Sequence, residues 1–277
     1  MGSFSAACLQ MRSSRDPAVN LRTFEDTVRE AASLGADYIQ TPEMTGMLVR
    51  DRDELLSKIS DEASDPLVAK AAALAKQLSV HLHIGSTAIR LDGEKVANRG
   101  FIFAPDGSLI ARYDKIHMFD VDLADGESWR ESRTYRPGEE AIVARTALGT
   151  IGMSVCYDLR FPQLYRAQAR AGAEILTVPA AFTRQTGQKH WHTLLRARAI
   201  ENGAFVIAAA QGGRHEDGRE TFGHSLIVAP DGAILADADG DEPCIVIADL
   251  DIGAVASQRA SIPNLTNERE FSLNIVG

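Results

Sequence analysis

The chain repeats two short sequence patterns in the same order, and this duplication constrains its fold more than any other feature. Residues 35–44, GADYIQTPEM, resemble residues 172–182, GAEILTVPAAF, because both join Gly-Ala to an acidic residue, an apolar run and a proline. Residues 101–111, FIFAPDGSLIA, resemble residues 226–236, LIVAPDGAILA. Pro-Asp-Gly between two β-prone runs is typical of a hairpin turn, in which glycine supplies the positive φ. The sequence therefore predicts two similar halves.

Each half also carries two segments with helical patterns. They cover residues 20–35 and 66–78 in the first half, and residues 161–172 and 189–203 in the second. Strands that alternate with helices in both halves predict two similar sheets packed face to face, with the helices outside. The expected fold class is α/β, a four-layer α-β-β-α sandwich of two pseudo-symmetric halves in one domain, residues 1–277. An ordinary single-sheet α/β fold with accidental similarity is the alternative.

Composition narrows the class of protein. The chain has 277 residues, of which 45% are hydrophobic, and a formal net charge of -9 without any cluster of lysine and arginine. These values favour a small-molecule substrate over a nucleic-acid or membrane partner, and no run approaches the roughly 20 apolar residues of a membrane span. Three cysteines, Cys8, Cys156 and Cys244, indicate a reducing compartment, so we expect a cytoplasmic protein. Cys8 and Cys244 lie in apolar strand-like runs and are expected to be packing residues.

Cys156 stands at the end of an apolar run, residues 149–155, shortly before the helix expected at residues 163–171. A thiol near a helix N-terminus is stabilised as the thiolate, and the backbone N–H of Tyr157 would be free to face an oxyanion. A single cysteine is more often a buried packing residue. Position alone therefore favours packing, and a catalytic role needs partner residues.

Two further residues at strand ends could supply those partners. Glu43 ends the first repeated strand, where the second repeat has Ala180, so the fold does not require a carboxylate there. Glu43 could be a general base if burial raises its pKa, or it could be a solvated loop carboxylate. Lys115 follows the first hairpin, and it could either lower the pKa of the thiol and bind an oxyanion, or extend to solvent. The polar stretch 117–140 is a candidate functional loop.

Other site patterns are weak. His81 and His83 share one side of an expected strand, and His190 and His192 flank a tryptophan, but neither pair has the cysteine or carboxylate partners of a zinc site. No GxSxG elbow, Walker loop or GxGxxG follows an expected strand. We therefore predict no metal and no cofactor, although spacing does not exclude a histidine base.

Three motifs together resemble the nitrilase superfamily of carbon–nitrogen hydrolases across nearly the whole chain. They are TPEM with Glu43, RYDKIHMFD with Lys115 and GMSVCYDLRFPQLYR with Cys156, in the order and at the spacing of that family. The resemblance implies a Glu-Lys-Cys triad on an α-β-β-α sandwich. It also implies a homodimer or higher homo-oligomer, formed through the helices beside the nucleophile.

Residues 187–225 look closest to the deaminated glutathione amidase branch of that superfamily, with the omega-amidases as its nearest relatives. By the same likeness Glu131 matches a second active-site glutamate, which positions the lysine and the substrate. Arg160, Phe182 and Thr186 match positions that hold the carboxylate end of the substrate. For Arg160 the role is physically reasonable, because a guanidinium binds a carboxylate through two parallel hydrogen bonds.

The sequence therefore predicts a thiol-dependent amidase in which Cys156 is the nucleophile, Glu43 the base, and Lys115 and the Tyr157 N–H the oxyanion donors. The expected substrate is a small amide with a carboxylate, deaminated glutathione first. Alternatives are an omega-amidase acting on α-ketoglutaramate, an N-carbamoyl amino acid hydrolase and a nitrile hydrolase. A protein of a different class, a catalytically silent scaffold, would keep the fold without needing all three residues.

Overall fold

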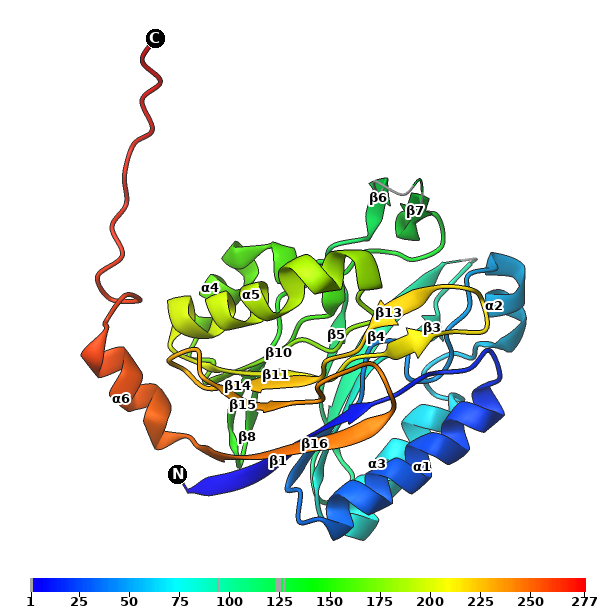
Figure 1. Cartoon of the computed structure of the whole chain (residues 1–277). Coiled ribbons are helices and arrows are strands. Elements are labelled where there is room, and N and C mark those ends of the chain that lie inside the picture. The colour runs from blue at the N-terminus through cyan, green and yellow to red at the C-terminus, as the bar shows by residue number, and fades with distance from the viewer. Residues whose placement is uncertain (1, 94, 123–125, 127) are drawn as a thin grey trace.

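The computed structural model describes the chain except residues 1, 94, 123–125 and 127. The first half of the chain, together with strand β16 from near the C-terminus, builds one six-stranded sheet (Figure 1). The strand order is β16-β1-β2-β3-β4-β5. The bounds are β1 Ser3–Gln10, β2 Tyr38–Gln40, β3 His81–Arg90, β4 Val96–Phe103, β5 Leu109–Asp114 and β16 Cys244–Asp251. Strands β1, β2 and β3 are parallel, while β4, β5 and β16 pair antiparallel with their neighbours.

The second half repeats this sheet. Its strand order is β15-β14-β11-β10-β9-β8. The bounds are β8 Val143–Thr146, β9 Gly149–Gly152, β10 Ile175–Thr177, β11 Phe205–Ala208, β14 Leu226–Val228 and β15 Ile234–Asp237. Strands β9, β10 and β11 are parallel, and the others pair antiparallel, so both sheets share one pattern. The two predicted hairpins are β4–β5 and β14–β15, which confirms the duplication.

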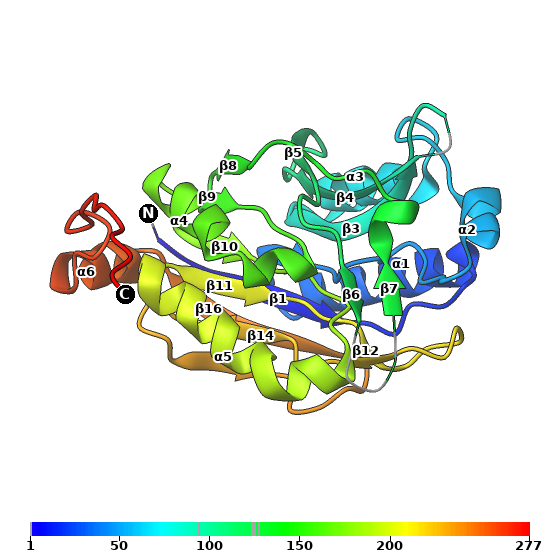
Figure 2. The ribbon, with the colours of Figure 1, turned by 90° about the horizontal axis from the view of Figure 1, so that it is seen from above.

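Two helices cover the outer face of each sheet, so the molecule has four layers (Figures 1 and 2). Helices α1 (Pro17–Ser33) and α3 (Pro66–Leu78) cover the first sheet, and α4 (Pro162–Arg170) and α5 (Arg184–Asn202) the second. The predicted sandwich is thus confirmed. Helix α3 has the predicted bounds, whereas α5 begins at Arg184 rather than at Lys189. The added turn contains Gly187, where the Phe222 side chain leaves no room for a Cβ.

The remaining elements are short. They are α2 Arg52–Lys58, α6 Gly253–Ser261, the 3-10 helices η1 Glu131–Arg133 and η2 Cys156–Arg160, and the strand pairs β6 Asp120–Asp122 with β7 Ser128–Arg130 and β12 Gly212–Arg214 with β13 Glu220–Phe222. The β6–β7 pair and η1 lie within the predicted loop 117–140. Among the described residues, no helix combines the length and the apolar character needed to cross a bilayer.

The core lies between the two sheets and continues beneath the helices. Tyr38 and Ile102 of the first sheet pack in one apolar cluster with Ile151 and Val206 of the second. Cys8 is buried there, as predicted. Cys244 is exposed, so the expectation that it packs in the core was wrong; it is the first residue of the edge strand β16 and follows a polar turn.

Candidate active site

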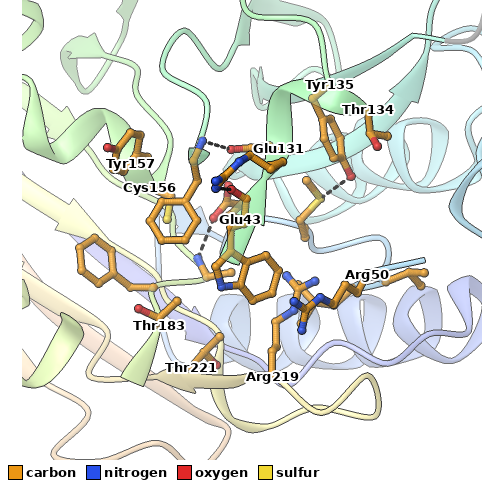
Figure 3. A pocket seen from close by; sticks show the side chains of 18 of the residues that line it. Glu43, Arg50, Glu131, Thr134, Tyr135, Cys156, Tyr157, Thr183, Arg219 and Thr221 are labelled. Carbon is orange, nitrogen blue, oxygen red and sulfur yellow. Dashed lines mark hydrogen bonds between the residues drawn. The ribbon is translucent and has the colours of Figure 1, made fainter. Parts of the chain in front are cut away.

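The three predicted catalytic residues meet at one end of the two sheets, in a cavity of about 590 Å³ (Figure 3). Glu43 follows strand β2, Lys115 follows β5, and Cys156 opens η2 beyond β9. Their exposed fractions are 4%, 2% and 8%. The carboxyl ends of parallel strands leave side chains at one sheet edge, which is where α/β proteins commonly bind ligands. The arrangement therefore places a thiol, a carboxylate and an ammonium group together, shielded from water.

Glu43 is held by four donors. Lys115 Nζ and Asn98 Nδ2 donate to its Oε1 at 2.9 Å each, and the Ala181 N–H donates to Oε2 at 2.9 Å. The Cys156 thiol also hydrogen-bonds to the carboxylate. Burial by itself would raise the pKa of Glu43, but Lys115 and these hydrogen bonds hold the pKa below its usual value. Burial therefore does not produce the raised pKa that was considered for a general base, and Glu43 is an ionised carboxylate.

Lys115 points inward, as the catalytic interpretation predicted. Its Nζ lies 2.9 Å from Oε1 of Glu43 and 2.9 Å from Oε2 of Glu131. Burial opposes its charge, yet the two carboxylates and the nearby thiol raise the pKa of Lys115 well above its usual value. The side chain therefore stays an ammonium group at neutral pH.

Cys156 is a thiol in this environment. Burial raises its pKa well above the ordinary value, the Glu43 carboxylate raises it further, and Lys115 opposes both effects without reversing them. Lys115 lowers the thiol pKa, as predicted, but burial and the Glu43 carboxylate outweigh its effect. A protonated thiol beside an ionised carboxylate is the state from which Glu43 can take the proton.

The turn at Cys156 has an unusual backbone. Its φ is 51°, in the left-handed region, and its N–H donates to Pro179 O at 2.9 Å. Cys156 opens the 3-10 helix η2, and α4 begins just beyond it at Pro162, one residue before the predicted start, so the thiol lies near a helix N-terminus as predicted. Tyr157 lies in the first turn of η2, where backbone N–H groups have no partner within the helix. Its N–H is therefore suited to binding an oxyanion.

Asp158 fixes this turn, a role that the sequence left unassigned. The carboxylate is fully buried. Its Oδ2 accepts from the Val155 N–H at 2.8 Å and from the Tyr113 hydroxyl at 2.7 Å, and its Oδ1 accepts from the backbone N–H of His117 at 3.0 Å. One side chain thus ties the nucleophile turn to the segment that carries Lys115.

Glu131 and Asn98 complete the polar floor of the cavity. Glu131 accepts from Lys115 through both oxygens, at 3.1 and 2.9 Å, and from the Phe119 N–H at 2.7 Å. Asn98 Nδ2 lies 3.2 Å from Oε1 of Glu131 and also donates to Glu43. Asn98 was not predicted from the sequence. The signal that could have indicated it is an amide side chain within the largely apolar strand β4, and the structure shows that this side chain is fully buried.

The three predicted substrate residues are placed differently. Phe182 and Thr186 line the cavity, near the start of α5. Arg160 does not belong to the lining: its guanidinium lies 5.0 Å from the Phe182 ring, and its Nη1 lies 3.2 Å from Nδ1 of His190. Arg160 therefore reaches the cavity only through Phe182, and its predicted contact with a carboxylate stays a prediction.

One cluster outside the cavity could hold a metal ion. Among the described residues, His192, His224 and Asp237 present ligand atoms within 4.8 Å of one another. Nε2 of His192 and Nδ1 of His224 lie 2.7 and 3.1 Å from the Asp237 carboxylate. His192 thus has a carboxylate partner, contrary to the sequence analysis, but the three groups already satisfy one another. His83 is buried elsewhere, on β3, where burial lowers its pKa to about 3.

Comparison with known proteins identifies the family. Residues 5–260 match the family described as carbon-nitrogen hydrolase. The chain belongs to this family. This carbon–nitrogen hydrolase is 38% identical over 269 residues to the deaminated glutathione amidase of Synechocystis sp., covering 96% of the chain and 98% of that protein. The predicted family and enzyme class are therefore confirmed. The alternative of a catalytically silent scaffold is not supported.

Solved structures agree. The C. elegans NitFhit protein matches with a TM-score of 0.90 and 31% identity, over 97% of this chain and 66% of that one, slightly less than two thirds of its length. A variant amidase from Nesterenkonia sp. AN1 matches with a TM-score of 0.78 and 26% identity, over 94% and 98% of the two chains, and shows Michael addition of acrylamide at its active-site cysteine. A reactive cysteine is thus recorded in a structural relative of this hydrolase.

Proposed function

We propose that this carbon–nitrogen hydrolase is a thiol-dependent amidase that cleaves the linear amide bond of deaminated glutathione. The observation that carries the proposal is the contact between the buried Glu43 carboxylate, the Lys115 ammonium and the Cys156 thiol at the floor of one cavity. The choice of substrate is supported by the similarity to the Synechocystis relative, a deaminated glutathione amidase. The reaction needs no cofactor or metal.

In the first step Glu43 takes the thiol proton while Cys156 Sγ forms a bond to the amide carbonyl carbon. The carbonyl oxygen becomes an oxyanion, which Lys115 Nζ and the Tyr157 N–H bind. One oxyanion donor typically contributes about 2.7–4 kcal/mol to transition-state stabilisation. The C–N bond then breaks, and Glu43 returns its proton to the departing amine.

In the second step a water molecule replaces the amine. Glu43 takes one proton from the water, whose oxygen attacks the thioester carbon, and the same donors bind the second oxyanion. The C–S bond breaks, the carboxylic acid leaves, and the proton on Glu43 returns to Cys156. Glu131 and Asn98 position Lys115 and Glu43 throughout both steps.

The test is turnover of a panel that holds deaminated glutathione, α-ketoglutaramate, an N-carbamoyl amino acid and a nitrile. We expect the highest kcat/KM for deaminated glutathione. Higher kcat/KM for α-ketoglutaramate would favour the omega-amidase alternative. Carbon dioxide released together with ammonia would indicate a carbamoylase, and nitrile turnover a nitrile hydrolase.

Two cysteine variants test the nucleophile. Cys156→Ala should lower kcat by roughly a thousandfold or more, since loss of a nucleophile removes the covalent route. Cys244→Ala is the matched control, because this thiol is exposed and outside the cavity, and it should keep wild-type activity. Undiminished turnover by Cys156→Ala would refute the assignment. Iodoacetamide should label Cys156, because Glu43 can take the thiol proton. If Cys156 were as unreactive as the buried Cys8, that result would also count against its assignment as the nucleophile.

We further propose that residues 1–277 form one catalytic domain of a cytoplasmic homodimer or higher homo-oligomer. A reducing compartment is supported by the three cysteines, all of which are free. Self-association is supported by an apolar C-terminal segment in which Phe271, Leu273 and Ile275 are each more than 80% exposed.

A further inference from the structure

The walls of the cavity away from Cys156 are rich in arginine. Five arginines line it, although the chain as a whole has a formal net charge of -9. They are Arg50, Arg52, Arg130, Arg133 and Arg219. Among the described residues, the lining carboxylates are Glu43, Glu131 and Glu220, of which two belong to the catalytic floor. The cavity therefore has a cationic side that the proposed chemistry does not use, and such a surface attracts anionic groups.

Two of these arginines share one aromatic ring. The guanidinium carbons of Arg50 and Arg219 lie 4.5 and 4.8 Å from the centroid of the Trp129 ring. Figure 3 shows both arginine side chains reaching toward one another across the cavity from Tyr157. An indole ring holds guanidinium groups in place through cation–π contacts, so their donors are presented in a fixed orientation.

The charges of the pair are only partly balanced. Arg219 forms an ion pair with Asp217, with Nη2 and Oδ2 separated by 2.9 Å. Within the part of the chain that the structure describes, Arg50 makes one hydrogen bond, from Nη2 to Ser128 O at 3.4 Å, and no ion pair. Two like charges held beside one ring repel each other, and an anion between them would relieve that repulsion.

We propose that Arg50, with Arg219 beside the same indole, binds a carboxylate on the amine side of the scissile amide. This inference rests on the proposed function. It narrows the expected substrates to amides whose leaving group carries its own carboxylate. Phe182 and Thr186, which the resemblance assigns to the acyl side, belong to the segment around Thr183, whose hydroxyl lies 2.7 Å from that of Thr186. Figure 3 shows Thr183 on a different wall from Arg50. A cavity of about 590 Å³ has room for a substrate that extends in both directions from the carbonyl carbon.

The test compares two substrates with the same acyl group. Deaminated glutathione carries a glycine carboxylate on its leaving group, whereas α-ketoglutaramate releases only ammonia. In Arg50→Met we expect the ratio of their kcat/KM values to fall about tenfold, through a higher KM for deaminated glutathione, because a charge-assisted hydrogen bond is lost. Arg50→Lys should lose less. Arg22→Met, an equal charge change on the exposed face of α1, is the control and should leave the ratio at its wild-type value.

An unchanged ratio in Arg50→Met would overturn the subsite, and so would an equal loss with both substrates. A binding measurement separates this failure from failure of the proposed function. With Cys156→Ala, calorimetry should give about tenfold tighter binding of deaminated glutathione than of its glycinamide analogue, and adding Arg50→Met should remove that preference. Absence of a preference, or of any binding, would overturn the subsite, whereas absence of wild-type turnover would overturn the function.

Discussion

In the free enzyme Cys156 is protonated and Glu43 is ionised, and this distribution decides how catalysis can begin. The thiol keeps the proton because burial disfavours the charged thiolate and the adjacent carboxylate disfavours a second negative charge. The carboxylate stays ionised because Lys115 and three other donors hold it. Nucleophile activation therefore does not require a preformed thiolate, and the proton moves only when the carbonyl carbon is in reach.

This protonation pattern predicts a flat pH profile. Glu43 has a pKa below its usual 4.5, while the pKa values of Cys156 and Lys115 lie well above 9.0 and 10.5. Since kcat/KM reports the ionisations of the free enzyme, we expect it to be constant between about pH 5.5 and 8.5. Measurement of kcat/KM across this range is the check. A fall centred near pH 6.5 would instead indicate a histidine base, which spacing in the sequence did not exclude.

The sequence identified the catalytic side chains but not their electrostatics. Glu43, Lys115 and Cys156 could be found because each lies at the end of an expected strand and within a motif that resembles the nitrilase superfamily. The thiol pKa is raised by burial and by the Glu43 carboxylate, whereas the Glu43 pKa is lowered by Lys115 and by hydrogen bonds that outweigh burial. Neither balance can be read from the sequence, because it depends on three-dimensional contacts. Asn98 escaped notice for the same reason, since its partners lie more than 30 positions away along the chain.

At the scale of elements, the two halves meet at Gly85 on strand β3. A Cβ at this position would run into the carbonyl oxygens of Thr41 and Pro42 and the Cβ of Pro179. Thr41 and Pro42 lead from β2 to Glu43, and Pro179 O accepts the hydrogen bond of the Cys156 N–H. The absence of a side chain at Gly85 therefore sets the distance between the two catalytic strand ends.

Gly85→Ala should consequently damage both stability and catalysis. The carbonyl oxygens of Thr41 and Pro42 on one side and Pro179 on the other would have to shift to admit the new Cβ. We therefore expect a loss of about 1–3 kcal/mol in the free energy of unfolding and a lower kcat. Urea unfolding and steady-state kinetics measure the two effects. Gly240→Ala is the control, since nothing lies within 4 Å of a Cβ at this position. Equal behaviour of the two variants would show that Gly85 does not set the spacing.

The duplicated elements were predictable because each half repeats local signals. Helix α3 is bounded by Pro66 and by Ser79 in the left-handed conformation, so sequence and structure agree on its ends. The predicted start of helix α5 was too late, since the segment RQTGQ before it contains Gly187, a poor helix former. The close packing of Phe222 against residue 187 explains why glycine occurs there. The β6–β7 pair has too few residues to give a periodic pattern.

At the scale of the whole molecule, a symmetric frame carries an asymmetric site. Strands β2 and β10 occupy equivalent positions in their sheets, yet the first leads to Glu43 and the second to Ala180. The Ala181 N–H, which comes from that second half, donates to Glu43. The duplication thus supplies rigid strand ends twice, and the halves have diverged so that one provides the base and the other the nucleophile.

The C-terminal segment forms an unpaired apolar stripe. Phe271, Leu273 and Ile275 alternate with other residues, so in an extended chain their side chains lie on one face, and their exposed fractions are 88%, 83% and 88%. Figure 1 shows this segment extending away from α6. Exposed apolar stripes of this kind mark contact sites between proteins. The proposed homodimer offers a second copy of the chain as the partner.

We therefore expect removal of residues 269–277 to weaken self-association. The deletion leaves the Asn264 hydrogen bond to Glu201 O intact, so α6 should keep its place. Analytical ultracentrifugation should show a dimer for the full chain and at least a tenfold higher dissociation constant after deletion, since several buried apolar side chains together contribute more than 1.4 kcal/mol. Changing Phe271, Leu273 and Ile275 to Ser should reproduce the effect at full length. Unchanged sedimentation in both variants would instead place the dimer contact on the helices beside Cys156.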